Sequence, residues 1–246
     1  ITLAALGAQV PRLRLGTLVA GNTYRHPAVL AKMAATLDHI TGGRVVLGLG
    51  SGWQENEHAQ YGIPFYTVAE RLKRLDEACQ VIKSLFNDET SNFGGAYYQL
   101  ANASLEPKPV QTPLPLLIGG GGEKVTLKIT AKYANEWNVW GTVETLRHKM
   151  AILDKHCEDL GRNPGAIKRT AVALLFMSED GAFLEKMRNA DLQQAAIIGT
   201  PAEVRDTVAE YEAAGVDELI VPDFTLGPKD QKIATLDTFI SQVAGR

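Results

Sequence analysis

Short apolar runs of strand length alternate with longer amphipathic segments along most of this chain. Val45–Leu49 is the clearest apolar run, and glycines bound it on both sides. A run of this kind is typical of a strand that is buried on both faces of a parallel sheet. Pro27–Thr41 is the clearest amphipathic segment, because its apolar side chains recur with the helical period of about 3.6 residues. Strands that alternate with helices predict a parallel sheet.

The alternation predicts six strand–helix units. The predicted strands span residues 13–20, 44–49, 114–118, 137–140, 170–176 and 218–221. The predicted helices span residues 1–9, 27–41, 67–86, 123–133, 143–160, 200–214 and a closing segment that ends near 243. Six units fit either an open doubly wound sheet or most of an eight-stranded barrel. Both architectures bind ligands at the carboxyl ends of their strands.

Two helix-start signals and one long insertion stand out within this alternation of strands and helices. Thr67 with Glu70, and Thr200 with Glu203, have the spacing of a capping box, so a helix is expected to begin at each threonine. Residues 87–113 are rich in glycine, proline and aromatic side chains, and they predict a long irregular insertion. Loops of this length are usually functional lids or disordered segments, and the aromatic side chains favour an ordered one.

Composition restricts the possible partners and compartment. The 246 residues suit one barrel domain, and a net charge of −3 without a basic block argues against nucleic acid. No apolar stretch reaches the roughly 20 residues that span a bilayer. Cys79 and Cys157 are the only cysteines, and burial of both inside helices would fit a reducing, cytoplasmic setting. No Cys/His spacing suggests a metal site.

Gly48, Gly50 and Gly52 alternate where the central apolar run ends. The pattern departs from a dinucleotide-binding fingerprint, because Trp53 stands where a third glycine would fall and no helix is expected before Pro64. We expect a flat, uncharged ligand to approach the bare backbone here. Polar and aromatic side chains follow at once, at Trp53, Asn56 and His58.

Gly119–Gly122 is the second glycine run, between a predicted buried strand and a predicted helix that begins immediately behind it. Exposed N–H groups at a helix start form an anion site, so this run predicts phosphate binding. The segment Asn22–Pro27 follows another predicted strand. There His26 or Asn22 would cap the next helix, or Arg25 would meet an anion, and the sequence leaves these alternatives open.

Four groups of residues, in the same order, resemble the luciferase-like monooxygenase superfamily. They are Gly16–Val19 with Asn22–Pro27, Leu47–Trp53, Pro107–Gln111 with Ile118–Gly121, and Gly199–Val204. The resemblance runs from about Leu13 to Val221 and is strongest to the branch that uses the deazaflavin coenzyme F420.

The resemblance implies an α/β fold, a TIM (β/α)₈ barrel of the bacterial-luciferase-like type. It would form a single domain over residues 1–246, with an insertion at 87–113. The family also has a cis peptide bond without proline, and Thr17–Leu18 occupies that place. The cofactor-binding residues implied are Thr17, Leu18, Ala20, Ser51, Gly52, Asn56, Gly120, Gly121 and Gly122. The candidates for the substrate side are Trp53, His58 and Trp140.

Several positions depart from the family pattern. Ala20 stands where a threonine is often found, and Trp53 where a relative that oxidises a sugar phosphate has a catalytic glutamate, which argues against that substrate. The first predicted strand corresponds to the family's third, so we expect the first two strands to be absent from this sequence. The family's second strand often carries an acidic residue and a histidine near the reactive ring, and no catalytic acid or base is assigned here.

The favoured hypothesis is an oxidoreductase that transfers a hydride between coenzyme F420 and a small organic substrate. The first alternative is a monooxygenase that uses FMN and molecular oxygen, and the second is a non-catalytic cofactor-binding relative or an inactive fragment. A third, an unrelated barrel enzyme acting on a sugar phosphate, has only Glu55, Glu57 and Asp223 as candidate carboxylates. We expect a cytoplasmic homodimer that binds neither nucleic acid nor membrane.

Overall fold

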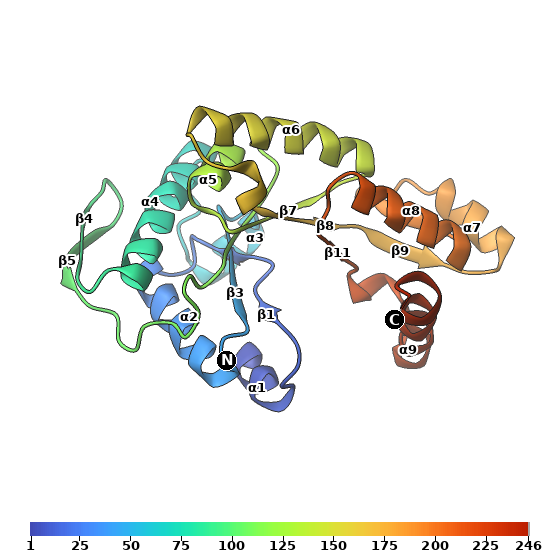
Figure 1. Ribbon diagram of the computed structural model, residues 1–246, viewed down its shortest axis with the longest axis horizontal. Helices are drawn as coiled ribbons and strands as arrows, with labels where there is room; N and C mark the ends of the chain where they lie inside the picture. The colour runs from blue at the N-terminus through green and yellow to red at the C-terminus, as the bar shows by residue number, and fades with distance from the viewer. Residues whose placement is uncertain (246) are drawn as a thin grey trace. The chain divides into compact units, whose positions relative to one another are not determined.

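The computed structural model describes residues 1–245, which fall into two compact units of helices and strands (Figure 1). The first unit comprises Ile1–Trp137 and His156–Ile167. The second comprises Asn138–Lys155 and the chain from Lys168 onward. The prediction of one barrel domain over residues 1–246 stays a prediction.

The first unit holds most of the predicted strand–helix alternation. Its helices are α1 (Thr2–Gln9), α2 (Pro27–Thr41), α3 (Glu55–Tyr61), α4 (Val68–Asn87) and α5 (Thr126–Tyr133). Its strands are β1 (Leu15–Gly16), β2 (Ala20–Gly21), β3 (Val45–Gly50), β4 (Ser91–Gly94), β5 (Gln99–Ala103), β6 (Leu116–Gly119) and the start of β7 (Glu136–Trp140). Helix α2 has the predicted bounds, because His26 caps its start and Gly42, with φ +63°, ends it.

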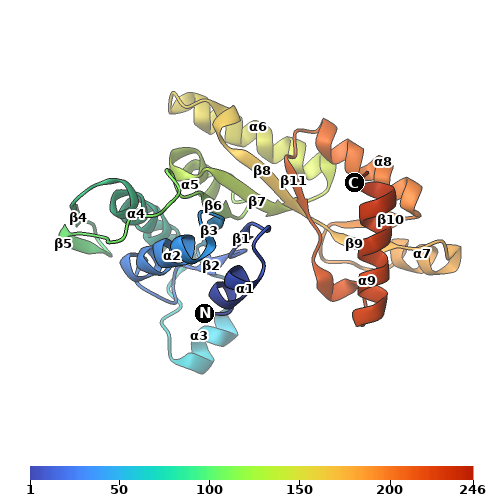
Figure 2. The ribbon, with the colours of Figure 1, turned by 60° about the horizontal axis from the view of Figure 1, so that its bottom comes forward.

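The sheet of the first unit is parallel around β3. Strand β3 pairs with β1 and β2 along one edge and with β6 along the other. All of β3 is buried, as its apolar sequence predicts. Helices α2 and α4 pack side by side (Figure 1, Figure 2) and contribute to the main apolar core with β3 and β6.

Arg44 joins the beginning of this sheet to α1. Its guanidinium donates hydrogen bonds to the carbonyl oxygens of Gly7 (2.8 Å), Val10 (2.9 Å) and Leu13 (2.5 Å). The same side chain bonds to the carbonyl of Thr41 through Nε at 2.8 Å. One cation therefore satisfies orphan carbonyls at the ends of two helices, α1 and α2.

The second unit differs most from the prediction. Its helices are α6 (Val143–Asp159, which ends in the first unit), α7 (Gly181–Arg188), α8 (Pro201–Ala213) and α9 (Lys229–Thr238). Its strands are the rest of β7, β8 (Lys168–Val172), β9 (Leu174–Met177), β10 (Ala196–Gly199) and β11 (Glu218–Ile220). Three short turns complete the chain, at Pro164–Ala166, Asp223–Thr225 and Phe239–Val243.

The single strand predicted over residues 170–176 is wrong. The chain forms β8 and β9 instead, since β8 pairs with β11 whereas β9 pairs with β10. Strand β10 and helix α7 were not predicted. The closing helix reaches Val243 as predicted, although only Lys229–Thr238 is α-helical and the last five residues form a π-helix.

The insertion at residues 87–113 is ordered, as its aromatic side chains predict, although it is more regular than expected. Strands β4 and β5 pair antiparallel in a hairpin. Tyr98 is buried, and Phe93 and Tyr97 pack against the same core.

Both predicted capping boxes are confirmed. The Thr67 and Thr200 side chains accept hydrogen bonds from the backbone N–H groups of Glu70 and Glu203, and each glutamate bonds back to its threonine. Cys79 and Cys157 are buried and free of disulfide bonds, also as predicted, and burial raises the pKa of the Cys79 thiol.

Candidate active site at the strand ends

The register of the first sheet brings three glycine-containing segments to one edge. Ala20 lies beside Leu49 across β2 and β3, and Leu49 lies beside Ile118 across β3 and β6. Because these strands are parallel, the residues that follow them leave the sheet at the same edge. Those residues include Ser51, Gly52 and Gly120–Gly122, so the predicted cofactor residues of three separate motifs converge.

The first of these strands is interrupted rather than continuous. The non-prolyl cis peptide bond is at Leu18–Val19, one bond beyond the Thr17–Leu18 position that the resemblance implied. The Thr17 hydroxyl donates to the Gly48 carbonyl at 2.7 Å, and the Leu18 side chain is 48% exposed. The prediction of one strand over residues 13–20 is therefore wrong, because residues 17–19 bulge between β1 and β2.

The glycines of β3 accommodate this bulge. A Cβ atom at Gly48 would lie 1.8 Å from the Thr17 carbonyl oxygen, and one at Gly50 would lie 2.8 Å from Val19 Cγ2. A Cβ at Gly119 would lie 2.9 Å from Val19 Cγ1. The expectation that Gly48 and Gly50 admit a ligand directly is thus corrected, since the neighbouring chain segment occupies that space.

Gly52 and Gly120 have the backbone conformation that favours glycine. Their φ angles are +85° and +129°, which residues with a side chain rarely adopt. Both lie beyond the strand ends, where the chain turns away from the sheet. The backbone at this edge therefore stays bare at two neighbouring points.

Helix α3 follows Gly52 closely, which the sequence analysis did not predict. It begins at Glu55 and ends at Gly62, whose φ of +66° terminates the helix. Asn56 and Trp53 are exposed, Trp53 to 81%. Two acidic residues in the first turn favour this helix start, and that signal was available in the sequence.

His58 lies under this helix and is only 1% exposed. Its Nδ1 lies 2.7 Å from the Gln54 carbonyl oxygen, and its Nε2 lies 2.7 Å from Thr23 Oγ1. Both ring nitrogens are therefore engaged within the chain. The histidine joins α3 to the loop after β2, and in this structure it does not face an open site.

The second glycine run is separated from the helix that follows it. Helix α5 begins at Thr126, not at Glu123, because residues 123–125 form a turn. A Cβ at Gly122 would lie 2.8 Å from Thr126 Oγ1, so the loop and the first helical hydroxyl are in close contact. No helix therefore starts directly behind Gly122, and the Thr126 hydroxyl is the first helical group beside the loop.

Trp137 and Trp140 have different environments. Trp137 is fully buried, and its indole N–H donates to the Gly120 carbonyl at 2.9 Å, which fixes the start of the glycine loop. Trp140 is half-buried and belongs to the second unit.

Contacts that the sequence did not predict hold the loop after β2 in place, and one of its two candidate caps is confirmed. Tyr98 of the insertion accepts a hydrogen bond from Asn22 Nδ2 at 3.2 Å, and His26 proves to be the cap of α2. The Tyr24 hydroxyl donates to the Glu57 carboxylate at 2.6 Å, and this bond is the main reason that the pKa of Tyr24 is raised. No local pattern signals contacts between residues so far apart in the sequence.

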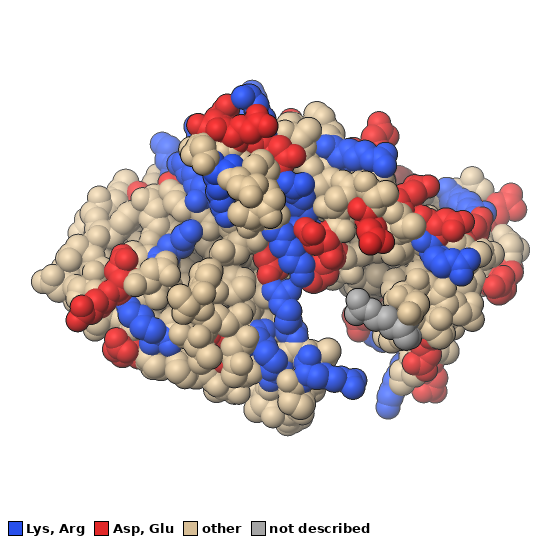
Figure 3. Space-filling view, in the orientation of Figure 1, with Lys and Arg blue, Asp and Glu red and all other residues tan. Residues whose placement is uncertain are grey.

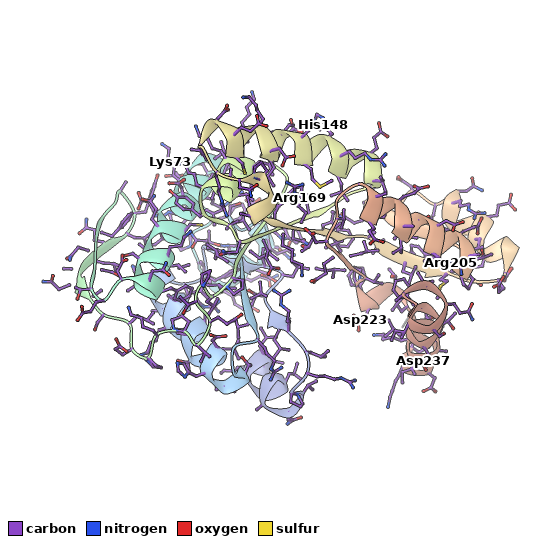
Figure 4. The ribbon with its side chains drawn as sticks, viewed as in Figure 1. Lys73, His148, Arg169, Arg205, Asp223 and Asp237 are labelled. Carbon is purple, nitrogen blue, oxygen red and sulfur yellow. The ribbon has the colours of Figure 1, made fainter. Side chains whose placement is uncertain are left out.

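Two of the three candidate carboxylates are engaged in contacts of their own. Glu57 is bound to Tyr24, whereas Asp223 (labelled in Figure 4) pairs with Lys232 at 2.5 Å in the second unit. The hydrogen bond from Lys232 lowers the pKa of Asp223. These contacts give no support to the sugar-phosphate alternative, which needs free carboxylates at strand ends.

Charge and metal-binding potential are unremarkable in the described part of the chain. Acidic and basic side chains are interspersed on the face shown in Figure 3. Among residues 1–245, no group of three or more His, Cys, Asp and Glu side chains is arranged to hold a metal ion. No helix within the same residues has both the length and the apolar character needed to cross a bilayer.

Comparison with known proteins identifies the family. Residues 1–187 match the luciferase-like monooxygenase family. The chain belongs to this family. Within it, the chain is 36% identical over 191 residues to the F420-dependent glucose-6-phosphate dehydrogenase of Kineococcus radiotolerans, covering 74% of this chain and 54% of that protein. It is 25% identical over 237 residues to the FMNH2-dependent dimethylsulfone monooxygenase of Pseudomonas putida, covering 79% and 65%.

Solved structures of the luciferase-like fold support the same architecture. The coenzyme F420 dependent tetrahydromethanopterin reductase of Methanopyrus kandleri superimposes with a TM-score of 0.82 at 20% identity, covering 99% of this chain and 86% of that one. An F420-dependent secondary alcohol dehydrogenase gives a TM-score of 0.79 at 20% identity, covering 98% and 70%. The predicted fold class is confirmed. The luciferase-like chain spans about half the length of the first curated relatives that it matches, 48% and 54% in two cases.

Proposed function

We propose that this luciferase-like protein is an oxidoreductase that transfers a hydride between coenzyme F420 and a small organic substrate. The observation that carries the proposal is the convergence of the cis Leu18–Val19 bulge, Ser51–Gly52 and Gly120–Gly122 at one sheet edge. The curated relatives include two F420-dependent dehydrogenases, which favours the deazaflavin. When bound, the deazaflavin supplies the hydride chemistry, and the protein orients its ring and excludes water.

The residues of this edge fit a flat ring with a polar tail. The half-exposed Leu18 offers an apolar surface. Gly52 adds no side chain of its own, and the Thr23 hydroxyl lies close to where its Cβ would be. Thr17, Ala20, Ser51 and Asn56 complete the proposed contacts with the ring and its polar chain. The Thr17 hydroxyl already donates to Gly48, so its role is to hold the bulge that faces the ring.

Gly120–Gly122 is proposed to hold the phosphate group. Backbone N–H groups in a loop without side chains can approach an anion closely. The bond from Trp137 to the Gly120 carbonyl holds one end of this loop in place. The N–H groups of the loop are thereby presented in a fixed arrangement, which lowers the entropy lost on binding.

On the substrate side we propose Trp53, whereas His58 contributes by supporting the loop at Thr23. The role of Trp140, which belongs to the second unit, stays a prediction from the sequence. Trp53 is an exposed aromatic side chain beside Gly52, and it offers an apolar contact rather than a carboxylate. The substrate of the Kineococcus radiotolerans enzyme is therefore not carried over to this chain. We propose a small organic molecule, and a homodimer in the cytoplasm.

The competing function is an FMN-dependent monooxygenase, which the Pseudomonas putida relative favours. Fluorescence titration of the purified protein with coenzyme F420 and, separately, with FMN distinguishes the two. We expect saturable F420 binding that weakens about tenfold in Gly122→Val, where the new side chain would crowd Thr126. Gly94→Val is the control, since Gly94, like Gly122, has no positive φ and a Cβ there meets nothing within 4 Å. Tight FMN binding without F420 binding would reject the proposal.

The other alternative is a relative that binds cofactor without turnover. An active enzyme transfers a hydride from reduced F420 to an oxidised substrate, and the gain of fluorescence as oxidised F420 forms, with saturation kinetics, would mark catalysis. Binding without turnover against a panel of small ketones, aldehydes and imines would favour the non-catalytic alternative.

A further inference from the structure

The insertion reaches the strand edge through Tyr98. The hydroxyl of this side chain, which is only 7% exposed, accepts the 3.2 Å hydrogen bond from Asn22. The rings of Tyr98 and His26 also meet edge to face, with centroids 5.2 Å apart. The insertion therefore contacts the loop after β2 at two points, although 76 residues separate Asn22 from Tyr98.

That loop borders the proposed cofactor site. The N–H of Asn22 donates to the Gly50 carbonyl at 2.9 Å. The Thr23 hydroxyl lies so near Gly52 that a Cβ there would be 2.8 Å from Thr23 Oγ1. A displacement of Asn22 or Thr23 would therefore move the backbone at Gly52.

One carboxylate on α4 holds the hairpin turn that presents Tyr98. Glu77 Oε1 accepts from the N–H of Ala96 at 2.8 Å, and Oε2 accepts from the N–H groups of Tyr97 at 2.9 Å and Tyr98 at 3.1 Å. The fit is close, since a Cβ at Gly95 would lie 2.3 Å from Glu77 Oε2. Hydrogen bonds to an ionised acceptor are stronger than neutral ones, so this carboxylate is a major anchor of the turn.

The turn has a packed side and an open side, and its Tyr97 and Tyr98 side chains pack against the main core. A cavity of about 800 Å³ lies between the turn, α4 and α5, and Ala96 and Tyr97 form part of its lining. Lys73, labelled in Figure 4, lies on α4 and also lines this cavity. Beside Glu77, the Arg74 guanidinium lies 4.5 Å from the Tyr97 ring centroid. The turn thus borders an open hollow on one side, and polar contacts from α4 hold it there in addition to the packing of Tyr97 and Tyr98.

We propose that Glu77 is a positioning residue for the cofactor site. Its carboxylate fixes the hairpin turn, the turn fixes Tyr98, and Tyr98 fixes the Asn22–His26 loop beside Gly52. The effect of Glu77 on cofactor binding rests on the proposed function. The structural part of the inference, the dependence of the loop on Glu77, is independent of any cofactor.

The test compares Glu77→Gln with the control Glu89→Gln, which changes an exposed glutamate of the same insertion. Glutamine keeps the shape of the side chain, but it replaces one acceptor by an NH2 group that faces N–H donors. Hydrogen exchange is measured without cofactor at the amides of Ala96–Tyr98 and of Asn22–His26. We expect exchange about tenfold faster in both segments of Glu77→Gln and unchanged in Glu89→Gln.

Cofactor titration of the same variants adds the binding readout. The titration uses the cofactor that the wild type binds. We expect Glu77→Gln to weaken this binding about tenfold. Tyr98→Phe should weaken it too, with no further loss in the double variant, because both changes act along one chain of contacts. Additive losses, or faster exchange at the turn with unchanged exchange at Asn22–His26, would overturn the proposal.

Two further results remain decisive. If Glu77→Gln does not fold, Tyr98→Phe alone must speed exchange at Asn22 and Tyr24, and unchanged exchange there overturns the proposal. If the wild type binds neither F420 nor FMN, the proposed function fails, whereas the exchange comparison still decides whether Glu77 positions the loop.

Discussion

At the scale of single residues, the glycines of β3 are explained by a neighbouring segment of the chain. Gly48 and Gly50 face the bulge at residues 17–19, where the chain leaves no room for a Cβ. The alternation of glycines is therefore a packing requirement first. Its effect on ligand binding is indirect, because it permits the bulge whose outer side the proposed ring would meet.

Replacement of Gly48 by alanine tests this explanation. The new Cβ would be placed 1.8 Å from the Thr17 carbonyl oxygen, so we expect the free energy of unfolding to fall by about 3 kcal/mol or more. Urea denaturation followed by circular dichroism measures the change. Gly94→Ala is the control, since a Cβ there meets nothing within 4 Å. A Gly48→Ala midpoint equal to that of the control would refute the explanation.

Gly50 offers a reciprocal test. Gly50→Ala would bring a Cβ to 2.8 Å from Val19 Cγ2, and Val19→Ala removes that methyl group. We expect each single variant to lose about 1–3 kcal/mol, and the double variant to lose less than the sum. The coupling free energy from a double-mutant cycle is the measurement, and strict additivity would show that the two side chains do not compete for space.

At the scale of elements, local signals predict helices well when the helix carries its own start and stop. The bounds of α2 follow from His26, Pro27 and Gly42, and both capping boxes form as their spacing predicts. The break between β8 and β9 has no such signal, because it depends on which neighbour each strand pairs with. Helix α7 is as short as α5, at 8 residues, and the Asp180 side chain that caps its start is the signal that the sequence offered.

The candidate site also has a part that local sequence patterns predict and a part that they do not. Its glycine segments and their common edge follow from the βα alternation, since parallel strands must end together. The contact between Tyr98 and Asn22 does not, because it requires the hairpin, the Glu77 anchor and the loop after β2 to be in place at once. Local patterns carry no information about such long-range contacts.

The two capping boxes predict that the stability of the fold depends on pH. Bonds from Thr67 lower the pKa of Glu70, and bonds from Thr200 lower the pKa of Glu203. Their contribution to stability is therefore complete above the unfolded pKa of about 4.3 and is lost as the pH falls through the lower folded pKa. We expect Glu203→Gln to reduce the loss of melting temperature between about pH 5 and pH 3. A calorimetric scan across that range checks this, with Glu89→Gln as the exposed control.

At the scale of the whole molecule, apolar burial is uneven between the two units. The main core cluster lies entirely within the first unit, on α2, β3, α4, the insertion, β6 and α5. Helix α9 of the second unit has no buried residue, and Ile233, Leu236 and Ile240 are exposed. The free energy of local opening should therefore differ between the units.

Hydrogen exchange followed by mass spectrometry measures that difference. We expect the amides of β3 and β6 to exchange at least about tenfold more slowly than those of β11 and α9 in dilute denaturant. The reason is the greater apolar area that opening of the first unit would expose. One common exchange rate for all four elements would instead indicate that the chain opens as a single cooperative body.

The Arg44 cluster has a consequence for the covalent continuity of the chain. Its guanidinium bonds to carbonyls on both sides of the exposed Pro11–Arg12 dipeptide, at Gly7 and Val10 before it and at Leu13 after it. Trypsin cleavage after Arg12 would leave both new chain ends attached to the same side chain. The nicked protein should then elute as one particle under native conditions, and its two fragments should separate only in denaturant. Arg44 would thus hold the two fragments together without a covalent bond.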